Sequence, residues 1–310
     1  MYSLNILEHL YDAAKVVLSL QETKPEICCL STSFSFAKLF SSVFFVLSLT
    51  SFCLQRGGFE LSCAVFERFW IKKEKRQMEE HILRIIILGI ISWATAFRLL
   101  RKFLPKRSFE FCNRLVSTVH ATLAFTLASL SVEDWTCPVC PPASKPSPSQ
   151  MQTLAVSLSY LIYDLICCQF DKRVTIDNTI HHLVSIVGIG AGLAYGKCGS
   201  ELIAALCITE MSSPFLHLRE LLKELGYGGT DLNLVADISF AAVFSFARMG
   251  FGPCLTWVTL TANNPLVIKA MAVGLQLVSA YWFYKIARMM NYKLTKRVAS
   301  KNLVCTEKMN

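Results

Sequence analysis

The sequence predicts an all-α protein, a polytopic transmembrane helix bundle of about seven spans around a polar cavity. Its composition, the length of its apolar runs and the placement of its charges support this. Hydrophobic residues make up 53% of the 310-residue chain and the mean hydropathy is +0.44, which is high for a soluble globular protein. A helix needs about 20 apolar residues to cross a hydrocarbon core of about 30 Å. The chain contains several runs of that length with few charges.

The candidate spans divide the chain into three regions. An N-terminal extension covers residues 1–80, a transmembrane domain covers 81–290 and a basic tail covers 291–310. Within the extension, the apolar run 36–54 fits an eighth span, but it carries Lys38 and several serines and threonines, so it fits a peripheral helix or an unusual leader equally well. The seven spans are 82–100, 115–131, 151–169, 180–196, 201–222, 233–252 and 266–287.

Lysine and arginine gather on one side of these spans. Membrane proteins retain such residues on the cytoplasmic side, so this side, with the C-terminus, is predicted to be cytoplasmic. Lys145 and Lys197 fall on the other side, and only the cluster at 72–76 disagrees. This arrangement of basic residues accounts for the net charge of +9. The sequence has no basic face interleaved with aromatic residues, which is the pattern that would indicate a nucleic-acid partner. The clusters are Arg101, Lys102, Lys106, Arg107, Lys172, Arg173, Lys223, Arg288, Lys293, Lys296, Arg297 and Lys301.

Thirteen cysteines are scattered through the chain, and most are predicted to be small buried hydrophobic residues. Cys137 and Cys140 stand apart in a Pro- and Ser-rich loop on the predicted lumenal or external side. On an oxidising side they fit a disulfide ring, and they also fit free thiols. Metal or redox chemistry is the weaker interpretation, because a single CxxC without a second pair is poor support for zinc. We therefore predict no metal site.

Ionisable groups recur at one depth in the predicted bundle. Such groups are costly in a bilayer and usually face the bundle interior or a water-filled cavity. At 1.5 Å per helical residue, carboxylates and imidazoles of five spans lie within about 8 Å of the predicted cytoplasmic ends. Glu210 is deeper, about 18 Å in. This layer predicts a polar cavity opening toward the cytoplasm. The shared layer consists of His120, Asp164, His181, His182, His217 and Asp237.

Each of these groups also has a structural interpretation. In the functional interpretation, Asp164 or Asp237 accepts a hydrogen bond from one ring nitrogen of a histidine, and the other ring nitrogen of that histidine is left to act as a base. Asp237 and His217 equally fit helix ends in water, and His120 equally fits a buried core histidine. Asp164 lies inside the apolar segment LSYLIYDLICC, for which we favour the cavity.

Neighbouring positions refine this interpretation. His181 and His182 point about 100° apart on a helix, so one is the principal cavity group, and we favour His182. Pro214 is predicted to kink its span. Arg248 either snorkels to the interface or pairs with Glu210. Small residues of the His-bearing span are predicted to let helices approach closely, namely Gly188, Gly190, Gly192 and Gly196.

Three segments together resemble the TLC domain, over roughly residues 80–290. They are the pair His181-His182, the segment EMSSPFLHLR that begins at Glu210, and Tyr160-x-x-Tyr163-Asp164 in the preceding span. Ceramide synthases, translocon-associated TRAM proteins and TLC domain-containing proteins share this domain. The resemblance implies a helix bundle around a lipid-accessible cavity. In the ceramide synthase branch, the histidine pair and an acidic segment transfer an acyl group from acyl-CoA to a sphingoid base.

The chain departs from that branch. The first acidic position is kept as Glu210, but the second is Ser213 and the preceding histidine is Thr209. The sequence is more similar to the smaller TLC domain-containing proteins, which implies a role in binding, moving or regulating membrane lipids. No cofactor is expected, membrane lipids are the expected partners, and the resemblance implies the endoplasmic reticulum.

Two further functions are kept as alternatives. The first is an acyltransferase that uses acyl-CoA as co-substrate, with His182 as general base. The second is a translocon helper, which no feature of the spans supports. An enzyme would use His181, His182, Asp164 and Glu210. The expected lipid-binding residues are His120, Tyr160, Ser213, His217 and Asp237.

Overall fold

The computed structural model describes residues 59–170 and 175–309, and every regular element in these ranges is helical. The predicted run 36–54 lies outside the described residues. The chain divides into two compact units, 1–75 and 76–310. The second unit holds the helices that form the candidate site.

Helix α3 (Phe59–Phe103) is a single helix, and its part within the second unit begins at Arg76. Leu83, Leu88 and Ile91 are exposed on it, whereas Trp93 packs against the buried core of the bundle. An exposed row of large apolar side chains on a helix of this length is expected where the solvent is lipid.

Three long helices follow: α4 (Phe109–Leu130), α5 (Pro148–Phe170) and α6 (Ile176–Tyr195). The Ser108 hydroxyl caps α4 by accepting a hydrogen bond from the backbone N–H of Phe111 at 2.9 Å. Helix α6 ends at Tyr195 and is capped by Gly196, whose φ of 61° is favourable for glycine.

The predicted span 201–222 is two helices, α7 (Gly199–Glu210) and α8 (Ser213–Leu222). Pro214 lies in the first turn of α8, where a missing N–H costs little, so it begins a helix instead of kinking one. A π-helical turn, η1 (Lys223–Tyr227), follows, and Gly226 has a φ of 92° there.

The last part of the chain forms α9 (Asp231–Phe244), the π-helical segment η2 (Ser245–Phe251) and α10 (Gly252–Thr261), which follow one another directly. Helix α11 (Leu266–Met309) then runs well beyond the predicted span, because the basic tail continues the same helix.

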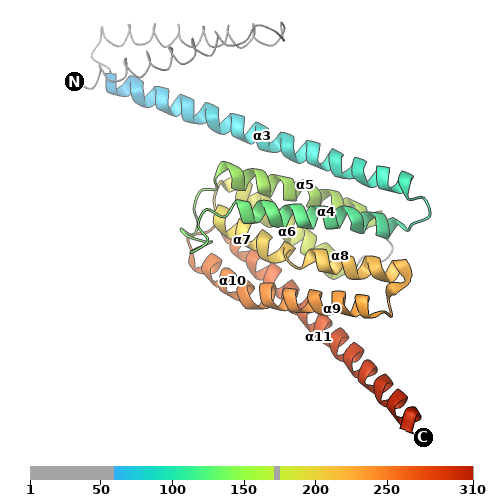
Figure 1. The fold of residues 1–310 in the computed structure, drawn as a ribbon. Coiled ribbons are helices and arrows are strands. Elements are labelled where there is room, and N and C mark those ends of the chain that lie inside the picture. The colour runs from blue at the N-terminus through green and yellow to red at the C-terminus, as the bar shows by residue number, and fades with distance from the viewer. Residues whose placement is uncertain (1–58, 171–174, 310) are drawn as a thin grey trace, which may run out of the picture. The chain divides into compact units, whose positions relative to one another are not determined.

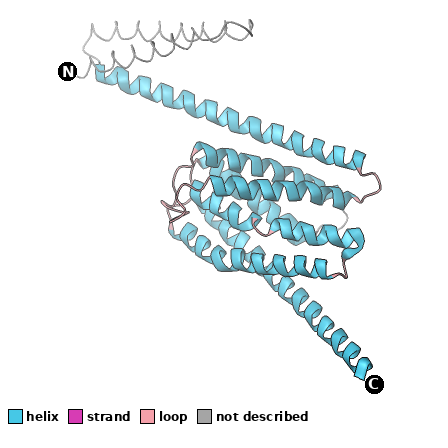
Figure 2. Ribbon diagram, in the orientation of Figure 1, coloured by secondary structure: helices cyan, strands magenta, loops and turns pink. Residues whose placement is uncertain are grey.

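Figures 1 and 2 show α4 to α11 as neighbouring helices, with loops at two ends of the bundle. Helix α6 packs against α5 and α11, and α4 packs against α5, α7 and α8. At one end, Glu201 accepts hydrogen bonds from the Ala143 backbone N–H at 2.6 Å and the Asn264 amide at 3.0 Å. At the other end, the Ser108 hydroxyl donates to Glu224 at 2.8 Å. These contacts link loops that are distant in sequence.

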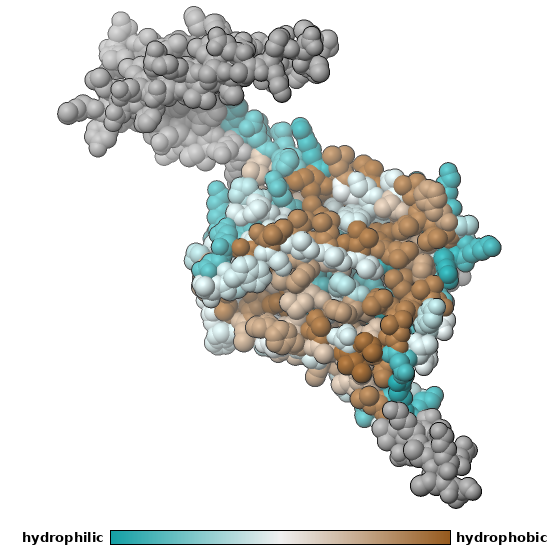
Figure 3. Space-filling view, viewed as in Figure 1, coloured by the Kyte–Doolittle hydropathy of each residue, from teal (hydrophilic) through white to brown (hydrophobic). Residues whose placement is uncertain are grey.

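Within residues 59–170 and 175–309, four helical segments are long and apolar enough to cross a membrane, and they identify an integral membrane protein. In Figure 3, hydrophobic side chains cover the middle of the visible face of the bundle and hydrophilic ones gather toward its edges. The predicted number of seven spans is not confirmed. Helices α7 and α8 are too short individually, and polar side chains lower the hydropathy of α4 and α6. The four segments are Arg76–Phe103, Pro148–Cys168, Asp231–Thr261 and Leu266–Arg297.

Candidate functional site

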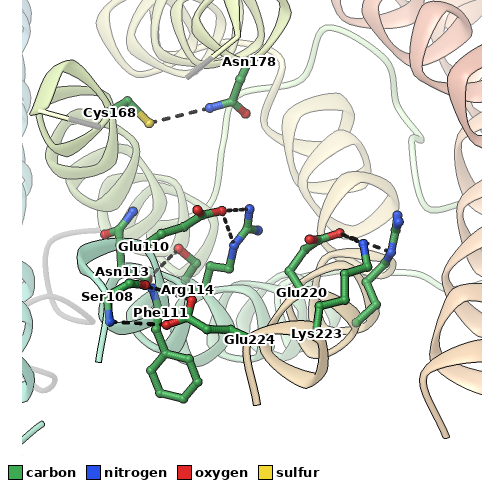
Figure 4. Close-up of polar contacts among 12 residues, drawn as sticks. Ser108, Glu110, Phe111, Asn113, Arg114, Cys168, Asn178, Glu220, Lys223 and Glu224 are labelled. Atoms are coloured by element: carbon green, nitrogen blue, oxygen red, sulfur yellow. Dashed lines mark hydrogen bonds and ion pairs between the residues drawn. The ribbon is translucent and has the colours of Figure 1, made fainter. Parts of the chain in front are cut away.

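A polar pocket of about 530 Å³ lies among α4, α5, α6, α8, α9 and α11. Among the residues that the sequence indicates, Asp164, Ser213 and His217 line it. The pocket also has charged walls, because a Glu110–Arg114 pair on α4 faces it, as Figure 4 shows. This pocket is called the polar pocket below.

The structure brings Asp164 and His182 together at its wall. Oδ2 of Asp164 lies 3.3 Å from Nε2 of His182, and the two residues are 7% and 6% exposed. The Asn113 amide donates to Oδ1 of Asp164 at 2.8 Å, and the Tyr163 hydroxyl donates to the Asn113 amide oxygen at 2.9 Å. This chain fixes the carboxylate, and its second oxygen is directed at the imidazole.

His181 faces a different space. Its ring centroid lies 4.9 Å from that of Trp282, and it lines a smaller pocket of about 100 Å³ among α6, α7, α10 and α11. Most residues in the walls of this apolar pocket are aliphatic, and Thr209 and Glu210 are among the polar ones. His181 therefore lines the apolar pocket and His182 meets Asp164 beside the polar pocket, because neighbouring helix positions point about 100° apart.

Arg248 lines both pockets. It is only 5% exposed, and among the described residues its side chain makes one hydrogen bond, from Nη2 to the Thr209 carbonyl at 2.8 Å. Its guanidinium lies 5.1 Å from the Phe244 ring centroid and 5.6 Å from that of Trp282, within cation–π range. Nε and Nη1 have no hydrogen-bond partner among the described residues. The guanidinium does not snorkel, and Glu210 interacts with it electrostatically without a direct ion pair in the part of the chain that the structure describes.

His120 and Tyr160 lie together in the core, outside the residues that line the two pockets. Their rings stack with centroids 3.6 Å apart, and Trp93 meets both edge-on at 5.8 and 5.6 Å. The Tyr160 hydroxyl donates to the Ser117 hydroxyl at 2.7 Å. The arrangement fits the structural interpretation of His120.

Asp237 belongs to a buried ion cluster instead of a helix end in water, since it is 0% exposed. Nε of Arg219 lies 2.8 Å from Oδ1 of Asp237, the Asn233 amide donates to Oδ2 at 3.0 Å, and Lys293 also contacts Oδ2. The cluster connects α8, α9 and α11. His217, by contrast, is half-buried and lines the polar pocket.

The two positions that depart from the ceramide synthase pattern bond to backbone. The Thr209 hydroxyl donates to the Ala205 carbonyl at 2.8 Å, and the Ser213 hydroxyl donates to the Thr209 carbonyl at 3.3 Å. Neither side chain replaces the acid–base group expected in that branch.

Sequence reasoning missed several groups of the site. Cys168 follows Asp164 by four residues, a spacing that could have placed both on one helix face. Asn113 and Arg219 gave no usable signal, because their partners come from other helices. Outside the pockets, Cys137 and Cys140 are joined in a disulfide, which was one of the interpretations left open for them.

Comparison with known proteins agrees with the site's position. Residues 110–288 match the family described as the TLC domain, a range that includes both histidines and all but one of the residues that line the two pockets. The chain is also 28% identical over 205 residues to TLC domain-containing protein 4-B of Danio rerio, covering 60% of this chain and 76% of that protein. With its membrane-spanning helices, this chain therefore belongs to the TLC domain family.

Proposed function

We propose that this protein binds, moves or regulates membrane lipids, and that a lipid lies across its two pockets. The observation that carries the proposal is the position of Arg248 between the polar and the apolar pocket, with two guanidinium nitrogens unpartnered. A lipid has a polar group joined to an apolar chain. A site for such a molecule needs adjoining polar and apolar walls.

The charge at this junction favours an anionic group. A buried guanidinium offers donors in a planar fork that matches a carboxylate or a phosphate. Arg248 is held by Phe244, Trp282 and the Thr209 carbonyl, so its free donors need no reordering to bind. Leu206 and Leu275, among other aliphatic residues, would contact the acyl chain.

The placement of the protein in its membrane is part of the proposal. We infer seven crossings, counting α7 with α8 and α9 with α10 as one crossing each, around a polar cavity open to the cytoplasm. The C-terminus is cytoplasmic in this arrangement, and the membrane is that of the endoplasmic reticulum. Membrane lipids are the partners, and the function needs no cofactor.

Photo-crosslinking tests the proposal. The purified full chain in nanodiscs is exposed to a photoactivatable fatty acid, to phosphatidic acid and to phosphatidylcholine bearing the same label. Hydrogen bonds to a charged group contribute about 1.5–3 kcal/mol, so Arg248→Leu should weaken binding of the anionic lipids about 10- to 100-fold. Arg288→Leu is the matched control, because Arg288 is exposed and lies over Tyr284. Equal labelling by all lipids, unaffected by Arg248→Leu, would refute the proposal.

A second function has one observation in its favour, the pairing of His182 with Asp164 at 3.3 Å. In an acyltransferase, an amine would attack the acyl-CoA thioester, His182 would accept the amine proton, and the thiol of coenzyme A would leave. His181 and Glu210 line the apolar pocket instead. Labelled acyl-CoA and a long-chain base, incubated with wild type, His181→Ala and His182→Ala, test this. Product from wild type that is absent from either variant would establish the enzyme, and no turnover would exclude it.

A further inference from the structure

Three buried side chains with different donor atoms converge beside the polar pocket. Asp164 and Cys168 lie one helical turn apart on the same face of α5, and His182 reaches them from α6. One donor atom from each residue lies within 4.8 Å of the other two. All three residues are buried.

The donor set matches a particular class of metal. A carboxylate, a thiolate and an imidazole are the usual ligands of Zn²⁺, whereas Mg²⁺ and Ca²⁺ prefer oxygen alone. Bonds of about 2.0–2.3 Å in a tetrahedron place neighbouring ligand atoms about 3.3–3.8 Å apart. Nε2 of His182 and Oδ2 of Asp164 already have that separation, at 3.3 Å. The three donor atoms lie within 4.8 Å of one another. A side-chain rotation that shifts an atom by about 1 Å is therefore enough to bring all three to tetrahedral spacing.

Other residues orient the ligands from outside. The Asn113 amide holds Oδ1 of Asp164, which leaves Oδ2 for a metal, and Tyr163 in turn holds Asn113. The Asn178 amide donates to Sγ of Cys168 at 3.6 Å, a contact visible in Figure 4. Metal ligands in proteins are oriented by such outer contacts.

We propose that Asp164, Cys168 and His182 bind a zinc ion. Asp164 and Cys168 line the polar pocket, so the fourth coordination position faces that space and is open to water or to a ligand, as in zinc sites with three protein ligands. This inference goes beyond the lipid-binding proposal and does not rest on it. It also replaces the expectation of no metal site. A metal-bound Nε2 could not serve as the base of the acyltransferase alternative.

Metal analysis of the whole chain tests the proposal. The protein is purified without a histidine tag and its zinc is measured by inductively coupled plasma mass spectrometry. We expect about one zinc per chain in wild type, and at least a tenfold loss in Cys168→Ala and in His182→Ala. Cys167→Ala is the matched control, because Cys167 is the adjacent buried thiol but packs in the hydrophobic core; it should keep its zinc.

Two further measurements separate binding from folding. The substitution Asn113→Ala removes the hydrogen bond to Oδ1 of Asp164. It should weaken zinc binding about 10- to 100-fold while the helical circular dichroism is unchanged. Cobalt-substituted wild type should show thiolate-to-cobalt charge-transfer absorption, and Cys168→His should bind cobalt without that absorption. Wild type with less than about a tenth of an equivalent of zinc after zinc loading, or Cys168→Ala with wild-type zinc content, would overturn the proposal.

Discussion

Nε2 of His182 and Oδ2 of Asp164 lie 3.3 Å apart, and neither residue is more than 7% exposed. At such burial the loss of Asp164 leaves Nε2 of His182 without this contact, and the loss of His182 leaves Oδ2 of Asp164 without it. The pair therefore links α5 and α6, whether or not either residue takes part in catalysis or metal binding.

A double-mutant cycle in metal-free protein measures this link. Asp164→Asn and His182→Gln should each lower the free energy of unfolding by about 1–3 kcal/mol. The double variant should lose less than the sum, with a coupling of about 0.5–3 kcal/mol. Asp134→Asn, in the loop between α4 and α5, should add to Asp164→Asn without coupling. Additivity in both cycles would show that the two side chains do not interact.

The ion cluster at Asp237 should be far more important for stability than a surface pair. Asp237→Ala leaves Arg219 and Lys293 without their shared carboxylate, and we expect a loss of about 3–5 kcal/mol. Asp231→Ala is the control, because that carboxylate is 90% exposed in its pair with Arg297; its loss should be at most about 1 kcal/mol. Thermal unfolding in the same detergent gives both values. Similar losses would show that Asp237 is not buried with its cations.

Gly89 marks a close approach of α3 to α5. A Cβ added at Gly89 would lie 2.3 Å from Oγ and 2.7 Å from Cβ of Ser159, whereas one added at Gly190 meets nothing within 4 Å. Gly89→Ala should therefore lower the free energy of unfolding by about 1–3 kcal/mol through overpacking. Gly190→Ala should be neutral or stabilising by up to about 1 kcal/mol, because alanine favours helix. Equal effects of the two substitutions would count against this packing.

Cysteine accessibility tests the proposed orientation. Lys106→Cys should react with a membrane-impermeant maleimide from the cytoplasmic side, and Lys145→Cys only from the opposite side, since both positions are exposed in loops. Cys137 and Cys140 should react only after reduction, because they form a disulfide. The exposed Cys254 is replaced by serine in all variants to remove background. Labelling of Lys145→Cys from the cytoplasm would invert the topology.

Local sequence patterns were sufficient for the helices and for part of the site. Apolar runs predicted the candidate spans within α5, α9–α10 and α11, because hydropathy is a local property. Asp164 lies inside an apolar run, where a carboxylate needs a polar surrounding, and the structure places it at the wall of the polar pocket. The glycine series was only partly informative: added Cβ atoms would meet neighbours at Gly188 and Gly192, but not at Gly190 or Gly196.

Depth along a helix does not determine which neighbour a side chain meets. His120, His217 and Asp237 share one predicted depth, yet the first stacks in the core, the second lines the polar pocket and the third joins an ion cluster. The order of helices around the bundle separates them, and that order depends on packing between distant segments.

By itself, the sequence determined that this is a helical membrane protein of the TLC type with histidines and carboxylates inside its bundle. Only the tertiary structure decided that Asp164 meets His182 beside Cys168, and that Arg248 lies between two pockets. The physical reason is that helical periodicity sets the direction of each side chain on its own helix. The contacts across helices depend on how the helices pack around a shared core.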